Sequence, residues 1–118
     1  MILVDTNIWI NHFRKSNPEL VTRLNLGSVA CHPFIIGELA CGNMKNREEL
    51  LKLFHSLPSV SVVDQDEYLD FVESRNLMGK GLGFVDIHLL ASALLEGIAF
   101  WTADRKLAET AKDMAISF

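Results

Sequence analysis

The sequence predicts an α/β fold with a mainly parallel central sheet flanked by helices. Short runs of aliphatic and β-branched residues alternate with amphipathic segments along the whole chain, and this alternation is typical of parallel βαβ units. The chain has 118 residues, of which 49% are hydrophobic. It can therefore bury one core and is too apolar to be disordered. We expect a single domain that spans residues 1–118.

Five short segments are candidates for the strands, because each is a run of mostly aliphatic, aromatic or β-branched residues. In chain order they are Ile2 to Val4, Val29 to Cys31, Val60 to Val63, Ile98 to Thr102 and Ala115 to Ser117. The last of them is expected at an edge of the sheet.

Six segments are expected to be helices, because apolar residues recur in them at helical spacing. Asn17-Pro18 should end the first helix, and Pro33 suits the first turn of the second, which Gly42-Asn43 should close. Asn46 can cap the third helix in a box-like pair with Glu49. The six segments are Thr6 to Lys15, Pro33 to Gly42, Asn46 to Leu57, Asp66 to Leu77, Phe84 to Glu96 and Asp104 to Lys112.

Four carboxylates stand alone in apolar segments. Asp5 follows Met1-Ile2-Leu3-Val4, Glu38 lies within Phe34 to Ala40, Asp86 is the only charge between Gly83 and Leu95, and Asp104 follows the run from Ile98 to Ala103. No Lys or Arg lies within these segments. A buried ionised carboxylate costs several kcal/mol unless it is paired, hydrogen-bonded or bound to a metal. A divalent cation would stabilise all four acids together.

The predicted fold brings these acids toward one edge of the sheet. Open parallel sheets bind ligands beyond the carboxyl ends of their strands, and Asp5 and Asp104 each come just after such a strand. Asp86 would lie in the first turn of a helix and Glu38 in the middle of another. Oxygen ligands favour Mg²⁺ or Mn²⁺. Such ions activate water for the hydrolysis of phosphodiesters.

The charge balance excludes a basic nucleic-acid-binding domain, because the formal net charge is -4. A nucleic-acid substrate remains compatible with it: 15 Asp and Glu minus the four isolated acids leave 11, which equals the number of Lys and Arg. A bound metal would neutralise the charge of the four isolated acids.

The sequence has no signal-peptide pattern and no apolar run near the roughly 18 residues that span a bilayer. We expect a cytoplasmic protein that has no membrane partner and keeps Cys31 and Cys41 as reduced, buried thiols.

Four short motifs carry a resemblance to a known family. They are Val4-Asp5-Thr6-Asn7, Ile36-Gly37-Glu38-Leu39, the segment from Gly83 to Ala91 around Asp86, and Thr102-Ala103-Asp104. In this order and at this length, the sequence resembles a PIN domain, specifically the VapC-type toxins of bacterial toxin-antitoxin pairs. The resemblance covers essentially the whole chain.

The resemblance implies a Mg²⁺-dependent endoribonuclease that cleaves RNA. It implies that Asp5, Glu38, Asp86 and Asp104 are the metal-binding acids, that Thr102 is a supporting polar residue of the catalytic site, and that Thr6 is the hydroxyl residue that follows the first acid. It also implies a homodimer and a small VapB-type antitoxin whose tail inserts at the active site.

Each of these residues also has a structural interpretation. Asp5 and Asp104 could cap the helices that follow them, and Asp86 would be favoured near the positive end of a helix dipole. Glu38 could be a surface acid, and Thr102 could be an ordinary strand residue. With these roles alone, the protein would be a non-catalytic interaction module.

Two other classes of Mg²⁺-binding α/β protein compete with a nuclease. A receiver-like signalling domain needs an acidic pair after its first strand and a phospho-accepting Asp after a later one. Val63-Asp64 could supply the acceptor, but only one acid follows the first strand. A haloacid dehalogenase-type phosphatase begins its nucleophile motif with two acids, whereas Asp5-Thr6-Asn7 contains one.

The remaining polar and aromatic residues give weaker signals. Arg75, Lys80 and Arg105 flank the acidic segments and are either phosphate contacts or solvated surface charges. None of the four histidines has ligand spacing. Trp9 and Trp101 lie in apolar runs and are expected in the core.

Overall fold

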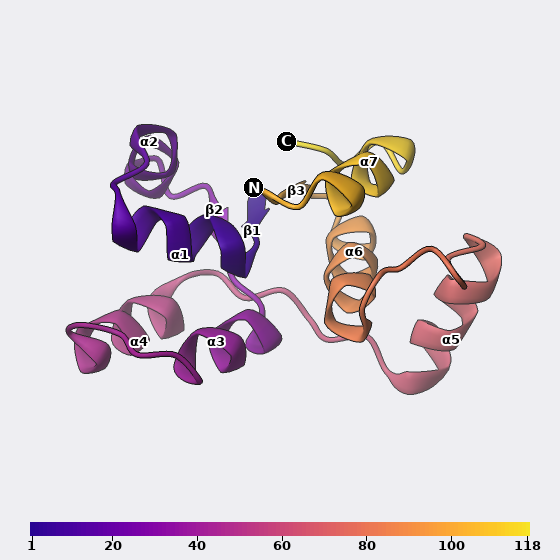
Figure 1. Cartoon of the computed structure of the whole chain (residues 1–118), viewed down its shortest axis with the longest axis horizontal. Helices are drawn as coiled ribbons and strands as arrows, with labels where there is room; N and C mark the ends of the chain where they lie inside the picture. Colours follow the sequence, from indigo (N-terminus) through magenta and orange to yellow (C-terminus); the bar gives the residue numbers. More distant parts are fainter.

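Three parallel strands form the central sheet in this computed structural model, which describes residues 1–118. The strands are β1 (Ile2–Val4), β2 (Val29–Ala30) and β3 (Ala99–Trp101), and their order is β2-β1-β3 (Figure 1). Leu3 pairs with Ala30 on one side and with Phe100 on the other. The prediction of an α/β fold with a parallel sheet is confirmed.

Seven helices surround the sheet. They are α1 (Thr6–Arg14), α2 (Pro18–Asn25), α3 (Pro33–Ala40), α4 (Arg47–Ser56), α5 (Gln65–Ser74), α6 (Phe84–Glu96) and α7 (Arg105–Asp113). Along the longest dimension of the molecule, about 40 Å, α1 to α4 occupy one end and α5 to α7 the other (Figure 1). No helix combines the length and the apolar character that crossing a membrane would require.

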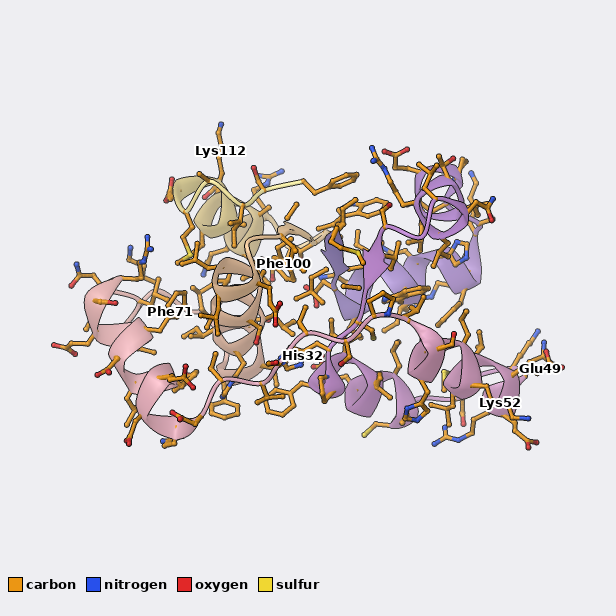
Figure 2. All side chains as sticks on the ribbon, turned by 180° about the vertical axis from the view of Figure 1, so that it is seen from behind. His32, Glu49, Lys52, Phe71, Phe100 and Lys112 are labelled. Carbon is orange, nitrogen blue, oxygen red and sulfur yellow. The ribbon has the colours of Figure 1, made fainter.

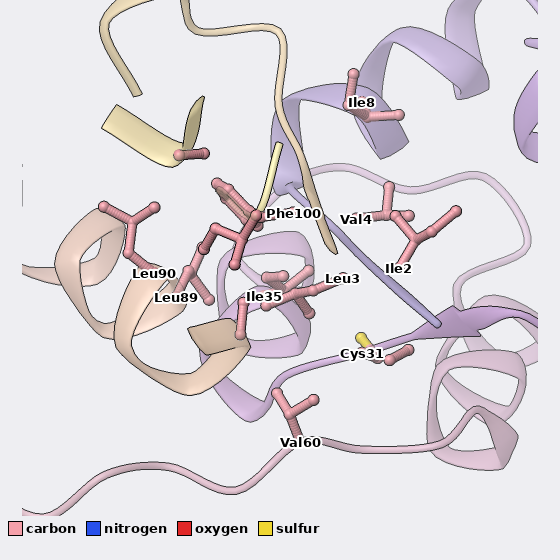
Figure 3. Close-up of a cluster of buried hydrophobic side chains, with 14 of the residues drawn as sticks. Ile2, Leu3, Val4, Ile8, Cys31, Ile35, Val60, Leu89, Leu90 and Phe100 are labelled. Carbon is pink, nitrogen blue, oxygen red and sulfur yellow. The ribbon is translucent and has the colours of Figure 1, made fainter. Parts of the chain in front are cut away.

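The core is one cluster of 23 buried residues at the centre of the sheet. Leu3 of β1 meets Ile35 of α3, Leu89 of α6 and Phe100 of β3 there, whereas Val4 lies beside Ile2 on the other face of the strand (Figure 3). In α6, every residue from Ile87 to Ala93 is buried, so the prediction of a buried helix is confirmed. The sheet and α6 together give the site a fixed platform.

Two predicted strands do not form. The segment from Val60 to Val63 forms no strand; only the preceding residue, Ser59, makes a bridge, to Cys31, whose N–H donates to the Pro58 oxygen at 2.7 Å. The next bond of a parallel ladder would need the N–H of residue 33, but Pro33 has none and begins α3, so Val60 and Val63 are buried without a ladder. The segment from Ala115 to Ser117 also makes one bridge, from Ser117 to Phe100. Ala115 adopts a positive φ of 59° directly after α7, which interrupts an extended conformation.

Two helix starts differ from the prediction. Asn17-Pro18 ends α1 and also begins α2, which the sequence analysis did not predict: the Asn17 side chain accepts a hydrogen bond from the Leu20 N–H, and Pro18 occupies the first turn. Asn46 precedes α4 in a left-handed conformation and makes no side-chain cap. The predicted pair of Asn46 with Glu49 is therefore wrong.

The two cysteines are free thiols in different surroundings. Cys31 is buried, and burial raises its pKa to about 11. Cys41 is exposed after the last turn of α3, because only one face of this short helix meets the core. The expectation that both thiols are buried is wrong for Cys41.

Candidate active site

Asp5 and Thr102 lie side by side because they follow neighbouring parallel strands. Val4 pairs with Trp101 in the sheet, and the Asp5 N–H donates to the Trp101 oxygen at 2.9 Å. The Thr102 hydroxyl donates to Asp5 Oδ2 at 2.8 Å. Asp5 Oδ1 accepts from the Thr6 N–H at 2.7 Å and caps α1. Asp5 is only 5% exposed, so its carboxylate is fixed by the sheet.

Asn7 completes this network, and the sequence analysis gave it no role. Its Nδ2 donates to Asp5 Oδ2 at 3.2 Å and to the Thr102 hydroxyl at 3.1 Å. Its Oδ1 accepts from the Ala103 N–H at 2.9 Å. Asn7 therefore ties the first turn of α1 to the segment that follows β3. The available signal was an amide two residues after a strand-end acid, since the separate oxygen and nitrogen of an amide can accept from one segment and donate to another.

Thr6 connects Asp5 to the third helix. Its hydroxyl donates to Glu38 Oε1 at 2.7 Å. Glu38 lies on the exposed side of α3, so the carboxylate is oriented by this single hydrogen bond while its other oxygen faces solvent. The two residues join the N-terminus of α1 to the middle of α3.

Asp86 lies in the first turn of α6, where the sequence analysis expected it. Its Oδ2 accepts the Gly83 N–H at 3.0 Å. A Cβ atom on Gly83 would lie 3.3 Å from this oxygen, which is closer than most Cβ contacts. Gly83 therefore allows the carboxylate to fold back over the helix N-terminus, and Asp86 stays half-buried.

Asp104 caps α7. Its Oδ1 accepts the Leu107 N–H at 3.0 Å, and its own N–H donates to the Thr102 hydroxyl at 3.1 Å. The side chain is exposed. Asp104 thus joins the network through its backbone, and its second carboxylate oxygen makes no hydrogen bond.

The acids influence one another electrostatically. The pKa of Asp5 is raised, first because burial disfavours its charge and then because of the charges of Asp86 and Glu38. The hydrogen bonds from Thr102 and Thr6 oppose this shift. Asp104 is not among the charges that affect Asp5. None of these acids pairs with a cation, since the one salt bridge joins Arg23 to Glu19 on α2.

The donor chemistry of this site fits a hard divalent cation. No three His, Cys, Asp or Glu side chains lie close enough together to enclose an ion. Mg²⁺ does not require such a cage, because it usually keeps several waters and binds through one or two carboxylates. Asp5, Glu38 and Asp86 supply only oxygen donors, and the charges of Glu38 and Asp86 disfavour the charge of Asp5. One or two of these acids could hold the ion directly while its waters reach the others, and Asp104 is a further candidate.

A groove opens beside Glu38. It lies between α1, α3 and α4, has a volume of about 1020 Å³, and is lined by Arg14 and Lys45 as well as Glu38. Its apolar lining consists of Ile10, Phe13, Leu39, Met44, Leu50 and Leu53. The groove is large enough to accept a segment of another molecule next to the acids.

The structure removes one competing hypothesis and agrees in part with another. Asp64 follows no strand; it is exposed and caps α5 in a capping box with Glu67, so a receiver-like domain would lack its phospho-acceptor. Asp5, Asp86 and Asp104 each accept a hydrogen bond at a helix start, as the interaction-module hypothesis expects. Capping leaves the mutual repulsion at Asp5 unexplained.

The cations near the acids are solvated. Arg75, Lys80 and Arg105 are exposed and form no salt bridge. Trp9 is 1% exposed, which confirms its place in the core. Trp101 is half-buried and packs on Phe118 with ring centroids 4.8 Å apart.

The chain is similar to known proteins over nearly its whole length. A model of the PIN domain matches residues 2–113. Ribonuclease VapC32 of Mycobacterium tuberculosis is 46% identical over 108 residues, which cover 91% of this chain and 87% of the relative. The crystal structure of PAE2754 from Pyrobaculum aerophilum has a TM-score of 0.71 at 19% identity and covers 99% of this chain and 87% of that chain. FitAcB from Neisseria gonorrhoeae has a TM-score of 0.63 at 20% identity, over 95% and 94% of the two chains. By sequence and by fold, the chain belongs to the PIN domain family, as a VapC-type member.

Proposed function

We propose that this protein is a Mg²⁺-dependent endoribonuclease toxin in which residues 1–118 form one nuclease domain. The observation that carries the proposal is the buried Asp5 carboxylate at the carboxyl ends of β1 and β3, in the field of Glu38 and Asp86 and without a cationic partner. The 46% identity to Ribonuclease VapC32 supports RNA as the substrate.

The chain's own residues hold and orient the acids. Thr102 and Asn7 hold Oδ2 of the Asp5 carboxylate, and the Thr6 N–H holds Oδ1, so both the position and the rotation of the carboxylate are fixed. Thr6 presents Glu38, and the Gly83 N–H presents Asp86. Asp5, Glu38 and Asp86 would hold Mg²⁺ or Mn²⁺, with Asp104 as the fourth acid. When bound, such an ion lowers the pKa of a water and neutralises charge on a phosphodiester.

We also propose a VapB-type antitoxin as the partner of the groove beside Glu38. Six hydrophobic side chains line the groove and Glu38 lies in its wall, so a bound segment would bury apolar surface next to one of the acids. The Leu53→Glu variant should weaken complex formation, because it places a charge in the lining without touching the acids. We further expect a homodimer, which light scattering on the purified protein would test.

The nuclease proposal is tested with end-labelled RNA and purified protein, in Mg²⁺ and in chelator. The Asp5→Asn variant should lose Mg²⁺-dependent cleavage. The matched control is Asp64→Asn, since Asp64 also caps a helix but lies outside the site; it should cleave like the wild type. Equal cleavage by the Asp5→Asn variant would refute the site. If no cleavage occurs and Mg²⁺ does not raise the Tm, the interaction-module alternative is favoured.

A further inference from the structure

His32 forms a buried polar connection that the sequence analysis did not use. It is fully buried at the start of α3, between α3 and α6 (Figure 2). Its Nδ1 accepts the Phe34 N–H at 3.0 Å and thereby caps α3. Its Nε2 lies 3.1 Å from the Ser92 hydroxyl of α6.

The direction of each hydrogen bond in this connection is determined. Burial lowers the pKa of His32 to about 4, so the ring is neutral near pH 7. Because Nδ1 accepts from Phe34, the ring proton lies on Nε2, which donates to the Ser92 oxygen. The Ser92 hydroxyl in turn donates to the Ser61 carbonyl at 2.8 Å. Every polar atom of the connection has a hydrogen-bond partner. The connection therefore specifies one arrangement of the start of α3, α6 and the segment that contains Ser61.

This connection lies behind two of the candidate acids. Glu38 is six residues from His32, and Asp86 is six residues from Ser92, which is about 9 Å along a helix at 1.5 Å per residue. The His32–Ser92 hydrogen bond is the one hydrogen bond between the α3 segment, which begins at His32, and α6. The other contacts between them are apolar or aromatic, such as Phe34 with His88 at a centroid distance of 4.9 Å. Apolar contacts are non-directional, whereas the His32–Ser92 hydrogen bond fixes both orientation and register.

We propose that His32 and Ser92 are positioning residues that hold the helix of Glu38 against the helix of Asp86, and thereby set the separation of the two acids. This inference rests on the proposed function, because it assigns the connection to the metal-binding acids. Neither residue touches the acids. Their effect is transmitted along α3 and α6 as rigid elements.

Two substitutions at His32 separate capping from the connection to α6. In the His32→Asn variant, the amide oxygen replaces Nδ1 and can cap α3, but nothing reaches Ser92. In the His32→Gln variant, the amide nitrogen replaces Nε2 and can reach Ser92, but the cap is lost. The Ser92→Ala variant removes the acceptor independently. The Ser28→Ala variant is the matched control, since Ser28 also donates one hydrogen bond to a backbone carbonyl, that of Arg23, remote from this connection.

The first readout is a distance that requires neither metal nor activity. Spin labels on native Cys41, beyond the last turn of α3, and on Leu95→Cys, which is 64% exposed in α6, report the relative position of the two helices. Cys31 is buried and should not react. Double electron–electron resonance should give a broader or shifted distance distribution between the two labels for His32→Asn and Ser92→Ala. The distribution for His32→Gln and Ser28→Ala should match that of the wild type.

The second readout is Mn²⁺ affinity by calorimetry without RNA. Loss of a residue that hydrogen-bonds directly to metal ligands typically weakens affinity by about 10- to 100-fold; because His32 and Ser92 act on the acids only through α3 and α6, we expect a loss of at most about 10-fold, for His32→Asn and Ser92→Ala only. The inference would be overturned if His32→Asn and Ser92→Ala kept the wild-type distance distribution and Mn²⁺ affinity. It would also be overturned if His32→Gln changed the distances and the affinity as much as these two variants do. If the His32→Asn variant does not fold, the distance distribution and the Mn²⁺ affinity of the Ser92→Ala variant test the inference. Absence of RNA cleavage by the wild type would count against the nuclease proposal, while the distance measurement would still judge the connection.

Discussion

Acidification should destabilise the protein through His32. Its pKa is lowered from 6.5 to about 4, mainly because burial disfavours the charged ring and secondarily because of His88. Between these two pH values the unfolded chain binds a proton at His32 that the folded chain does not. Stability is therefore complete above pH 6.5 and decreases as the pH falls toward 4.

The size of this effect follows from the shift. A difference of about 2.5 pKa units corresponds to about 3.4 kcal/mol at 1.36 kcal/mol per unit, and about 2.5 kcal/mol of it should be lost between pH 7.5 and pH 4.5. Domains of this size are stable by about 5–15 kcal/mol. Protonation of His32 would thus remove a substantial fraction of the total. The charged ring could no longer accept the Phe34 N–H, so the cap of α3 is lost at the same time.

Urea unfolding at a series of pH values measures this loss. Other groups also titrate in this range, so the quantity of interest is the difference between the wild type and the His32→Gln variant, which has no titratable group at this position. The wild type should be the more stable protein at pH 7.5, and the two curves should converge by about 2.5 kcal/mol at pH 4.5. Parallel curves would refute the reasoning, because they would show that His32 does not titrate between its folded and unfolded pKa values.

Three further outcomes are expected. Asp5→Asn should raise the Tm measured in chelator, because it removes a buried charge that Glu38 and Asp86 repel; a lower Tm would contradict the repulsion. Asn7→Ala should cost about 1–3 kcal/mol in urea unfolding and reduce cleavage, since its partners lose their hydrogen bonds; unchanged cleavage would show that Asp5 needs no orientation by Asn7. Leu89→Ala, at a fully buried position, should cost about 2–5 kcal/mol without changing Mn²⁺ affinity in calorimetry, whereas a changed affinity would mean that the core sets the acid geometry directly.

The strands that carry the site could be predicted because their apolar runs are short and end in a polar residue. Ile2 to Val4 and Ala99 to Trp101 form strands next to each other, and this adjacency brings Asp5 beside Thr102. Helix α6 was equally predictable, since its apolar run is longer than a strand and ends at Gly97, which takes the left-handed conformation that favours glycine.

The segments that were predicted wrongly are those in which local preference and tertiary context disagree. The β-branched run from Val60 to Val63 predicts a strand, yet the sheet offers it only one bridge beyond the end of β2. Asn17-Pro18 is both a helix terminator and a good helix start, and only the packing of Leu20, which is fully buried, selects the second.

Within the site, the residue types were predictable and the connections were not. The isolation of the four acids in apolar sequence is visible without a structure. The bonds from Asn7 to Thr102 and from Thr6 to Glu38 join positions 95 and 32 residues apart. His32 and Ser92 were missed for the same reason, because each is a single polar residue in an apolar run and its partner is set by the packing of α3 against α6.

Capping and metal binding by the aspartates are compatible, and the hydrogen bonds show why. Asp86 uses Oδ2 and Asp104 uses Oδ1 to cap a helix, which leaves one oxygen of each for another ligand. The helix starts therefore fix these two carboxylates before any cation arrives. Asp5 differs, because both of its oxygens accept hydrogen bonds from the chain while it is buried near two like charges. Its position is thus the most tightly determined and its charge the least favourable, so a bound cation should stabilise Asp5 more than any other acid of the site.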